Sequence, residues 1–136
     1  MLKEKATAFY REDNDLNCAE SILYGANEEY DLGLDQKTLD TMSSFGGGMA
    51  VESVCGALTG AVAVLGIMFT GNKSLDSEER KTIIADFYEQ FRARFGTDNC
   101  REIKEKFRDE RVGCQEVVKL SADVLETIVR KYRTNQ

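Results

Sequence analysis

The chain has 136 residues, of which 42% are hydrophobic and 31% are charged. This composition suits a globular protein, and we expect one domain that spans residues 1–136. The net charge of −6 excludes the strongly basic surface of nucleic-acid-binding proteins, so we expect no nucleic-acid partner. The absence of histidine excludes Ser–His and Cys–His catalytic pairs and histidine-bound metals.

The start of the chain is predicted to be helical with polar breaks. A short first helix is indicated by apolar residues at helical spacing, namely Leu2, Ala6 and Phe9. A polar break at Asp13–Asn17 leads to a second helix at about Asn17–Tyr30. Asn17 can cap this helix, with Glu20 in the reciprocal position. Asp35 can cap a short third helix.

The stretch Phe45–Gly71 is predicted to hold the central helix of the fold. It opens with a run of glycines, contains no lysine or arginine, and carries its one charge at Glu52. Gly56 and Gly60 lie four residues apart, which places them on one stripe that another backbone can approach closely. A helix that is apolar nearly all round belongs in an interior. We therefore expect an all-α, compact helical bundle packed around a buried Gly/Ala-rich helix at Val54–Phe69.

The apolar run Val54–Thr70 is close to the lower limit of ~17 residues for a membrane-spanning helix. It lacks the flanking aromatic belt and basic loop that orient such helices, so we expect no membrane span. The start of the chain has no apolar core of a signal peptide. We expect a cytoplasmic protein whose thiols are mostly reduced.

The second half of the chain is predicted to add three more helices. After a turn at Gly71–Ser74, a long amphipathic helix opens at Asp76 and ends at Gly96. Thr97 or Asp98 is expected to cap a short helix, and a charged connection of residues 108–113 follows it. The last helix is expected from about Cys114 to Tyr132.

The cysteines share one kind of position in these predicted elements. Each falls in the first turn of a helix, and the four are Cys18, Cys55, Cys100 and Cys114. The unpaired N–H groups and partial positive charge of a helix N-terminus stabilise a thiolate, which is the reactive form of cysteine. We therefore predict that the pKa of Cys55 lies below the value of ~8.5 for a free thiol, unless Glu52 lies close enough to oppose the effect.

The order of the helices predicts where the cysteines lie in space. Alternate helices of a compact bundle run in the same direction, so Cys18, Cys55 and Cys100 are expected to gather at one end. An extended connection at Asp109–Gly113 would bring Cys114 back beside Cys100. The prediction is that all four sulfurs share one end of the bundle.

This arrangement of residues resembles a known family. The residues that carry the resemblance are Asn17-Cys18-Ala19, Phe45-Gly46-Gly47-Gly48, Cys55-Gly56-Ala57-Leu58-Thr59-Gly60, Cys100 and Cys114. They are similar to the redox-active protein family named for its motif, C_GCAxxG_C_C, and the likeness covers nearly the whole chain. It implies a redox role for cysteine. Members are often encoded near transporter genes, which implies a redox partner linked to a transporter.

Three kinds of function fit the four cysteines. In the first, the thiolate of Cys55 attacks a disulfide and a second cysteine resolves the mixed disulfide without any cofactor; Cys100 and Cys114 are closest in sequence and are expected to pair. In the second, all four thiolates bind an iron–sulfur cluster or zinc, for which they form a soft ligand set. In the third, the cysteines are inert buried side chains of a helical interaction protein.

The glycines beside Cys55 add candidate binding positions. Glycine lets the backbone come close to a bound group, so the mouth of the central helix can approach a substrate or cofactor. The candidate positions are Gly46, Gly47, Gly48 and Gly56. A turn before a buried helix would need glycine as well. The substrate, the electron donor and the cysteine pairing stay open at this point, and a homo-oligomer is compatible with the sequence.

Overall fold

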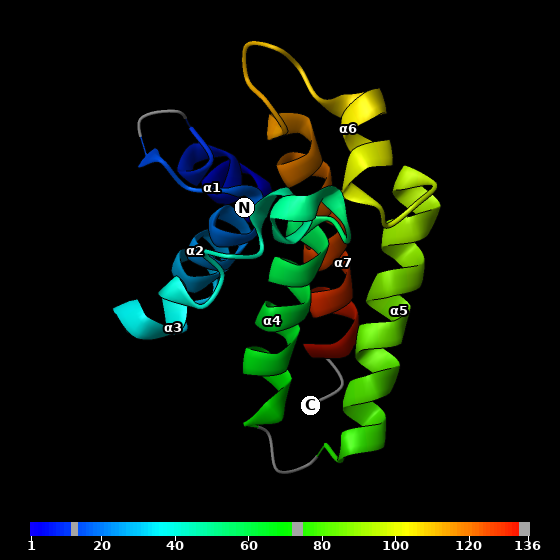
Figure 1. Ribbon diagram of the computed structural model, residues 1–136. Coiled ribbons are helices and arrows are strands. Elements are labelled where there is room, and N and C mark those ends of the chain that lie inside the picture. Colours follow the sequence, from blue (N-terminus) through cyan, green and yellow to red (C-terminus); the bar gives the residue numbers. More distant parts are fainter. Residues whose placement is uncertain (12–13, 72–74, 134–136) are drawn as a thin grey trace.

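The computed structural model describes residues 1–11, 14–71 and 75–133, and it confirms the all-α fold (Figure 1). The elements are α1 (Leu2–Phe9), α2 (Cys18–Glu29), α3 (Gln36–Asp40), the irregular turn η2 (Gly48–Glu52), α4 (Gly56–Thr70), α5 (Ser77–Phe95), α6 (Cys100–Phe107) and α7 (Gln115–Arg133). Within these described ranges, the backbone forms isolated β-bridges but no β-strand. No described helix is both long and apolar enough to cross a lipid bilayer.

The buried helix α4 lies at the centre, as predicted. It packs against α2, α5 and α7, and Thr70 is its only exposed residue. Figure 1 shows α7 running beside α4, and α7 also contacts α1, α2, α5 and α6. The core is therefore built around two helices, one apolar on nearly every side and one apolar along a single face.

The caps predicted at the starts of α2, α3 and α5 are confirmed. The Asn17 side chain accepts a hydrogen bond from the Glu20 N–H (2.8 Å), and the Glu20 carboxylate accepts one from the Asn17 N–H (3.1 Å). Asp35 and Asp76 each accept a hydrogen bond from a backbone N–H in the first turn of their helices. Gly96 ends α5 in the left-handed conformation, with φ = 78°. These boundaries are local, because each depends on side chains within three or four positions.

Two predicted boundaries were wrong. The central helix begins at Gly56 and not at Val54, because the turn before it runs through left-handed backbone from Gly47 to Ala50. The cap of α6 is Asn99, whose side chain accepts a hydrogen bond from the backbone of the first turn. The predicted cap Asp98 is engaged elsewhere, since its carboxylate accepts a hydrogen bond from the Tyr88 hydroxyl (2.6 Å).

Parts of two predicted breaks lie outside the described residues. These are Asp13 in the polar break before α2 and residues 72–74 of the turn after α4. The described remainder of the first break, residues 14–17, is non-α-helical as predicted.

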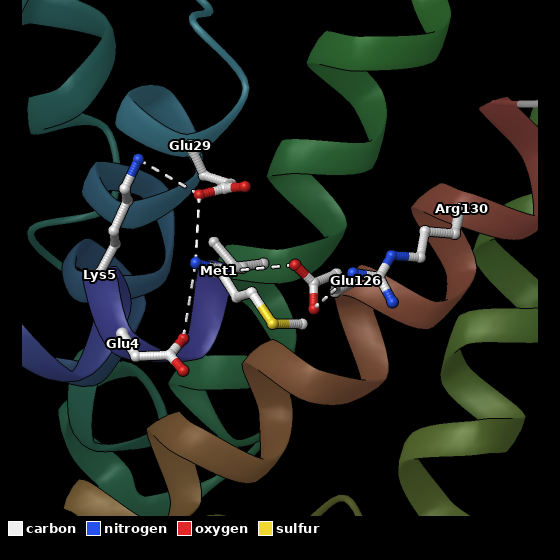
Figure 2. Close-up of polar contacts among 7 residues, drawn as sticks. Met1, Glu4, Lys5, Glu29, Glu126 and Arg130 are labelled. Carbon is white, nitrogen blue, oxygen red and sulfur yellow. Dashed lines mark hydrogen bonds and ion pairs between the residues drawn. The ribbon is translucent and has the colours of Figure 1, made fainter.

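The start of the chain is tied to its last helix (Figure 2). The backbone N–H of Leu2, at the start of α1, donates a hydrogen bond to the buried carboxylate of Glu126 in α7 (3.2 Å). The second oxygen of Glu126 lies 3.7 Å from the Arg130 guanidinium. Because α1 also packs on α2, this contact holds α1 in place beside the segment that leads to the cysteines.

Candidate functional site

The four cysteines line one small pocket at the end of the bundle where their helices begin. The pocket has a volume of about 180 Å³, and its cysteines are Cys18, Cys55, Cys100 and Cys114. Each lies at the first residue of a helix or directly before it. The prediction that the four gather at one end is therefore confirmed. All four are free thiols.

The cysteines differ in how accessible they are. Cys55 and Cys100 are deeply buried, with exposed fractions of 4% and 5%. Cys18 and Cys114 are only half-buried. A molecule that approaches from solvent therefore meets Cys18 and Cys114 first.

A short backbone pairing holds the starts of α4 and α6 side by side. The Cys55 N–H donates a hydrogen bond to the Asp98 carbonyl (2.9 Å), and the Cys100 N–H donates one to the Ser53 carbonyl (2.5 Å). Val54 and Asn99 form the isolated antiparallel bridge between them. One bridge is too short to leave an alternating pattern in the sequence, so sequence analysis did not detect this contact.

Cys114 is brought to the pocket by a tight turn. The expected extended connection is absent, because Asp109 and Gly113 exchange two backbone hydrogen bonds (2.9 and 2.7 Å). The Cys114 N–H donates a hydrogen bond to the hydroxyl of Tyr10, at the end of α1 (3.0 Å). Tyr10 also lines the cysteine pocket. Sequence analysis missed this residue, since a single tyrosine at the end of a helix carries no distinguishing signal.

The candidate glycines make room for the cysteine side chains. A Cβ atom on Gly56 would lie 2.5 Å from the Cys18 sulfur, and one on Gly48 would lie 2.8 Å from the Cys100 Cβ. A Cβ on Gly46 would overlap the side chain of Asn17. Gly47 lines the pocket directly and has φ = 62°. Side chains at Gly46, Gly48 and Gly56 would displace the cysteines or the helix starts that carry them.

The predicted activation of Cys55 was wrong. Burial raises the pKa of the Cys55 thiol to about 12, because little water reaches the sulfur to solvate a thiolate. The N–H groups of Leu58 and Ala57 lower this pKa, as expected at a helix N-terminus, but they are outweighed by desolvation. Cys55 is therefore a protonated thiol at neutral pH, unsuited to begin an attack.

Burial also raises the pKa of the Cys100 and Cys114 thiols. The positive charge of Lys104 lowers the pKa of both. Arg108 and a hydrogen bond from the Tyr10 hydroxyl lower that of Cys114 further. Burial outweighs these opposing groups, so the pKa of both thiols is raised overall.

Cys18 lies close to the three other cysteines that line the pocket. Negative charge on Cys18 raises the pKa of each of the three other thiols, Cys55, Cys100 and Cys114. Such electrostatic effects fall off with distance, so Cys18 lies within reach of all three. Cys100 is linked to the three other thiols in the same way, so this electrostatic effect does not single out one central thiol.

The arrangement provides no ready metal site. Within residues 1–11, 14–71 and 75–133, no group of three or more cysteine, aspartate or glutamate side chains is placed to hold a metal ion together.

The comparison with family models decides the family. The model described as "Putative redox-active protein (C_GCAxxG_C_C)" matches residues 16–128. The chain belongs to this C_GCAxxG_C_C family. The matched range includes all four cysteines and the three glycines before α4, so the family pattern and the pocket coincide. The family's description is of a redox-active protein. No curated protein and no solved structure matches the chain.

Proposed function

We propose that this C_GCAxxG_C_C protein carries out thiol–disulfide exchange, with Cys18 as the attacking thiol and Cys114 as the resolving thiol. The observation that carries this proposal is the convergence of four free cysteines from four helix starts on one pocket. Exchange needs sulfurs that can reach each other in turn.

The exchange proceeds in two balanced steps. The Cys18 thiolate attacks one sulfur of a substrate disulfide, which forms a mixed disulfide and releases one substrate thiolate. The Cys114 thiolate then attacks the Cys18 sulfur and releases the second substrate thiolate. The protein is oxidised to a Cys18–Cys114 disulfide, the substrate gains two electrons, and the protons of the two cysteines pass through water to the two product thiols.

Accessibility and charge support this assignment. Cys18 and Cys114 are the half-buried pair, so a mixed disulfide has space to form on Cys18. Lys104, Arg108 and the Tyr10 hydroxyl stabilise negative charge on Cys114. Cys55 and Cys100 lie deeper, and the pKa of both thiols is raised by burial, so neither is assigned a step in the exchange.

Turnover requires a partner that restores the thiols. A dithiol reductant that attacks the Cys18–Cys114 disulfide returns the protein to its reduced form and is itself oxidised to a disulfide. This reductant is the redox partner in the proposal.

The test is anaerobic reaction of the reduced protein with oxidised glutathione. We expect the full chain to lose two thiols, and peptide mapping to find Cys18 joined to Cys114. The Cys114→Ser variant should accumulate a mixed disulfide on Cys18, seen as added mass of one glutathione. The Cys18→Ser variant should lose most of the reaction. Oxidation of Cys18→Ser at the rate of the unaltered chain would overturn the assignment.

Metal analysis of the same preparation tests the competing function. Anaerobically purified protein should be colourless and contain no stoichiometric iron or zinc. A stoichiometric metal that is lost when any one of the four cysteines becomes serine would replace thiol–disulfide exchange by a metal site with four cysteine ligands.

A further inference from the structure

A large polar cleft adjoins the cysteine pocket. Its volume is about 1010 Å³, at the upper end of the range of roughly 300–1,000 Å³ for small-molecule sites. Four residues line both the cleft and the cysteine pocket, and they are Tyr10, Leu16, Asn17 and Arg108. The residues directly before α2 and the α6–α7 connection, which border the cleft, lie at the same end of the molecule (Figure 1).

Residues next to the two accessible cysteines in sequence line the cleft. Asn17, the residue before Cys18, lines one part of the cleft, and Gly113 and Gln115, which flank Cys114, line another. Cys18 and Cys114 themselves line the adjoining small pocket and not the cleft, so a molecule held in the cleft lies next to the chain segments that carry these two cysteines. The two deeper cysteines line the small pocket. The described residues next to these two cysteines in sequence do not line the cleft.

Arginine side chains from three segments line this cleft. They are Arg11 after α1, Arg108 after α6, and Arg111 in the following turn. Within the described part of the chain, Arg11 and Arg108 have no carboxylate partner, and Arg111 has only Asp109, at 4.0 Å. A guanidinium group binds a carboxylate through two parallel hydrogen bonds, so these arginines are suited to bind carboxylates of a ligand.

The cleft also contains acidic side chains. Asp15, Glu20 and Glu110 line it. Glu20 is already engaged, because its carboxylate accepts the hydrogen bond from the Asn17 N–H. Asp15 and Glu110 remain to bind a positive group. The cleft thus pairs cationic and anionic positions, in a chain whose net charge is −6.

We infer that the cleft binds the disulfide of an amino acid or short peptide and presents it to Cys18. Its carboxylates bind Arg11 and Arg108, and its ammonium groups bind Asp15 or Glu110. This inference rests on the proposed thiol–disulfide exchange and adds its substrate class. The recognition side chains are all exposed, and the cleft that they line has the volume of a small-molecule site.

The experiment compares disulfides of different charge. Reduced protein is mixed with oxidised glutathione, hydroxyethyl disulfide (neutral), cystamine (cationic) and insulin (a protein disulfide). Each rate is divided by the rate of the same disulfide with dithiothreitol, which removes its intrinsic reactivity. We expect the normalised rate with oxidised glutathione to exceed the others by about tenfold or more, the gain from one or two charge-assisted hydrogen bonds.

Variants of the arginines test the recognition itself. Arg11→Gln and Arg11→Glu should reduce the glutathione-to-hydroxyethyl ratio progressively, by about tenfold for the charge reversal. Arg108→Gln should reduce the same ratio; because Arg108 also lowers the pKa of Cys114, the ratio and not the absolute rate is compared. Arg94→Gln is the matched control, since Arg94 lies on α5 away from the cleft and should leave the ratio unchanged.

The outcomes separate this inference from the function on which it rests. Equal normalised rates for all four disulfides, preference for cystamine or insulin, or a ratio that survives Arg11→Glu would overturn the substrate class while leaving thiol–disulfide exchange intact. Failure of every disulfide to react would overturn both.

Discussion

At the residue scale, burial decides the reactivity of the cysteines more strongly than helix position does. All four sit at helix starts, yet the pKa of Cys55 is raised to about 12, with burial the largest cause. Hydrogen bonds from two N–H groups do not compensate for the loss of solvating water around a thiolate. Partial exposure therefore separates Cys18 and Cys114 from the other two in the proposed chemistry.

The buried Cys55 thiol should make the folded state less stable at alkaline pH. In the unfolded chain it ionises near its ordinary pKa of about 8.5, whereas in the fold its pKa is about 12. The contribution of the protonated Cys55 thiol to the free energy of unfolding is therefore fully present below about pH 8.5. It declines as the pH rises toward 12, by up to ~1.4 kcal/mol per pH unit. Urea unfolding in reducing buffer at several alkaline pH values measures this decline.

The Cys55→Ala variant is the control for that measurement. It should show a shallower loss of stability between about pH 8.5 and 10, because the group that titrates there in the unfolded chain is gone. An identical slope in the two proteins would contradict the raised pKa of Cys55.

A methyl group at Gly56 should disturb the site through Cys18. The added Cβ would lie 2.5 Å from the Cys18 sulfur and 2.8 Å from the Phe45 carbonyl oxygen, so the sulfur or the helix start must move. We expect Gly56→Ala to slow Cys18–Cys114 disulfide formation and to lower stability by ~1–3 kcal/mol. Thiol counting and thermal unfolding measure the two effects. Disulfide formation at the unaltered rate would show that the Cys18 position is not critical.

At the element scale, small residues set how closely α4 and α2 approach. A Cβ on Gly60 would lie 2.7 Å from the Ala19 carbonyl oxygen in α2. Ala19 is the residue after Cys18, so the same close crossing fixes the start of α2 relative to the start of α4. The stripe of small residues that the sequence predicts on the central helix therefore also positions Cys18 at the pocket.

Two glycines of α4 provide a matched pair of substitutions. Gly60→Ala should destabilise the protein by ~1–3 kcal/mol, because the methyl group meets backbone that cannot move aside. Gly66→Ala, in the same helix but with open space at its Cβ, should instead be neutral or stabilising by up to ~1 kcal/mol. Thermal unfolding of both variants measures the difference. Equal effects would show that the crossing is looser than the structure indicates.

At the scale of the whole molecule, the first and last helices close the bundle. Glu126 is buried in α7, with 6% exposed, and it accepts the hydrogen bond from the Leu2 N–H. This contact joins residues at opposite ends of the sequence. It also holds α1, whose last turn leads to Tyr10 and so to the Cys114 backbone.

Removal of the Glu126 carboxylate should weaken the whole fold. Glu126→Ala leaves the buried Leu2 N–H without its acceptor, which we expect to cost ~1–3 kcal/mol. Glu105→Ala, at an exposed position of α6, should change stability by less than ~0.5 kcal/mol. Urea unfolding measures both. If Glu126→Ala matches the Glu105→Ala control, the N-terminal tie contributes nothing to stability.

The sequence by itself determined the features that depend on neighbours along the chain. These are the helical fold, the caps at Asn17, Asp35 and Asp76, the apolar central helix, and the position of each cysteine at a helix start. Each follows from hydrogen bonds or periodicity within a few residues, which a sequence displays directly. The family resemblance was also readable there, and the family match confirms it.

Only the tertiary structure decided which cysteines are accessible to solvent. Burial of Cys55, the bridge between Val54 and Asn99, and the contact of Tyr10 with Cys114 all join residues far apart in the chain. The raised pKa of Cys55 has the same origin, because desolvation depends on every segment that packs around the sulfur. A helix start marks where a thiol lies along the chain, but the packing of the other helices determines whether water can solvate its charge.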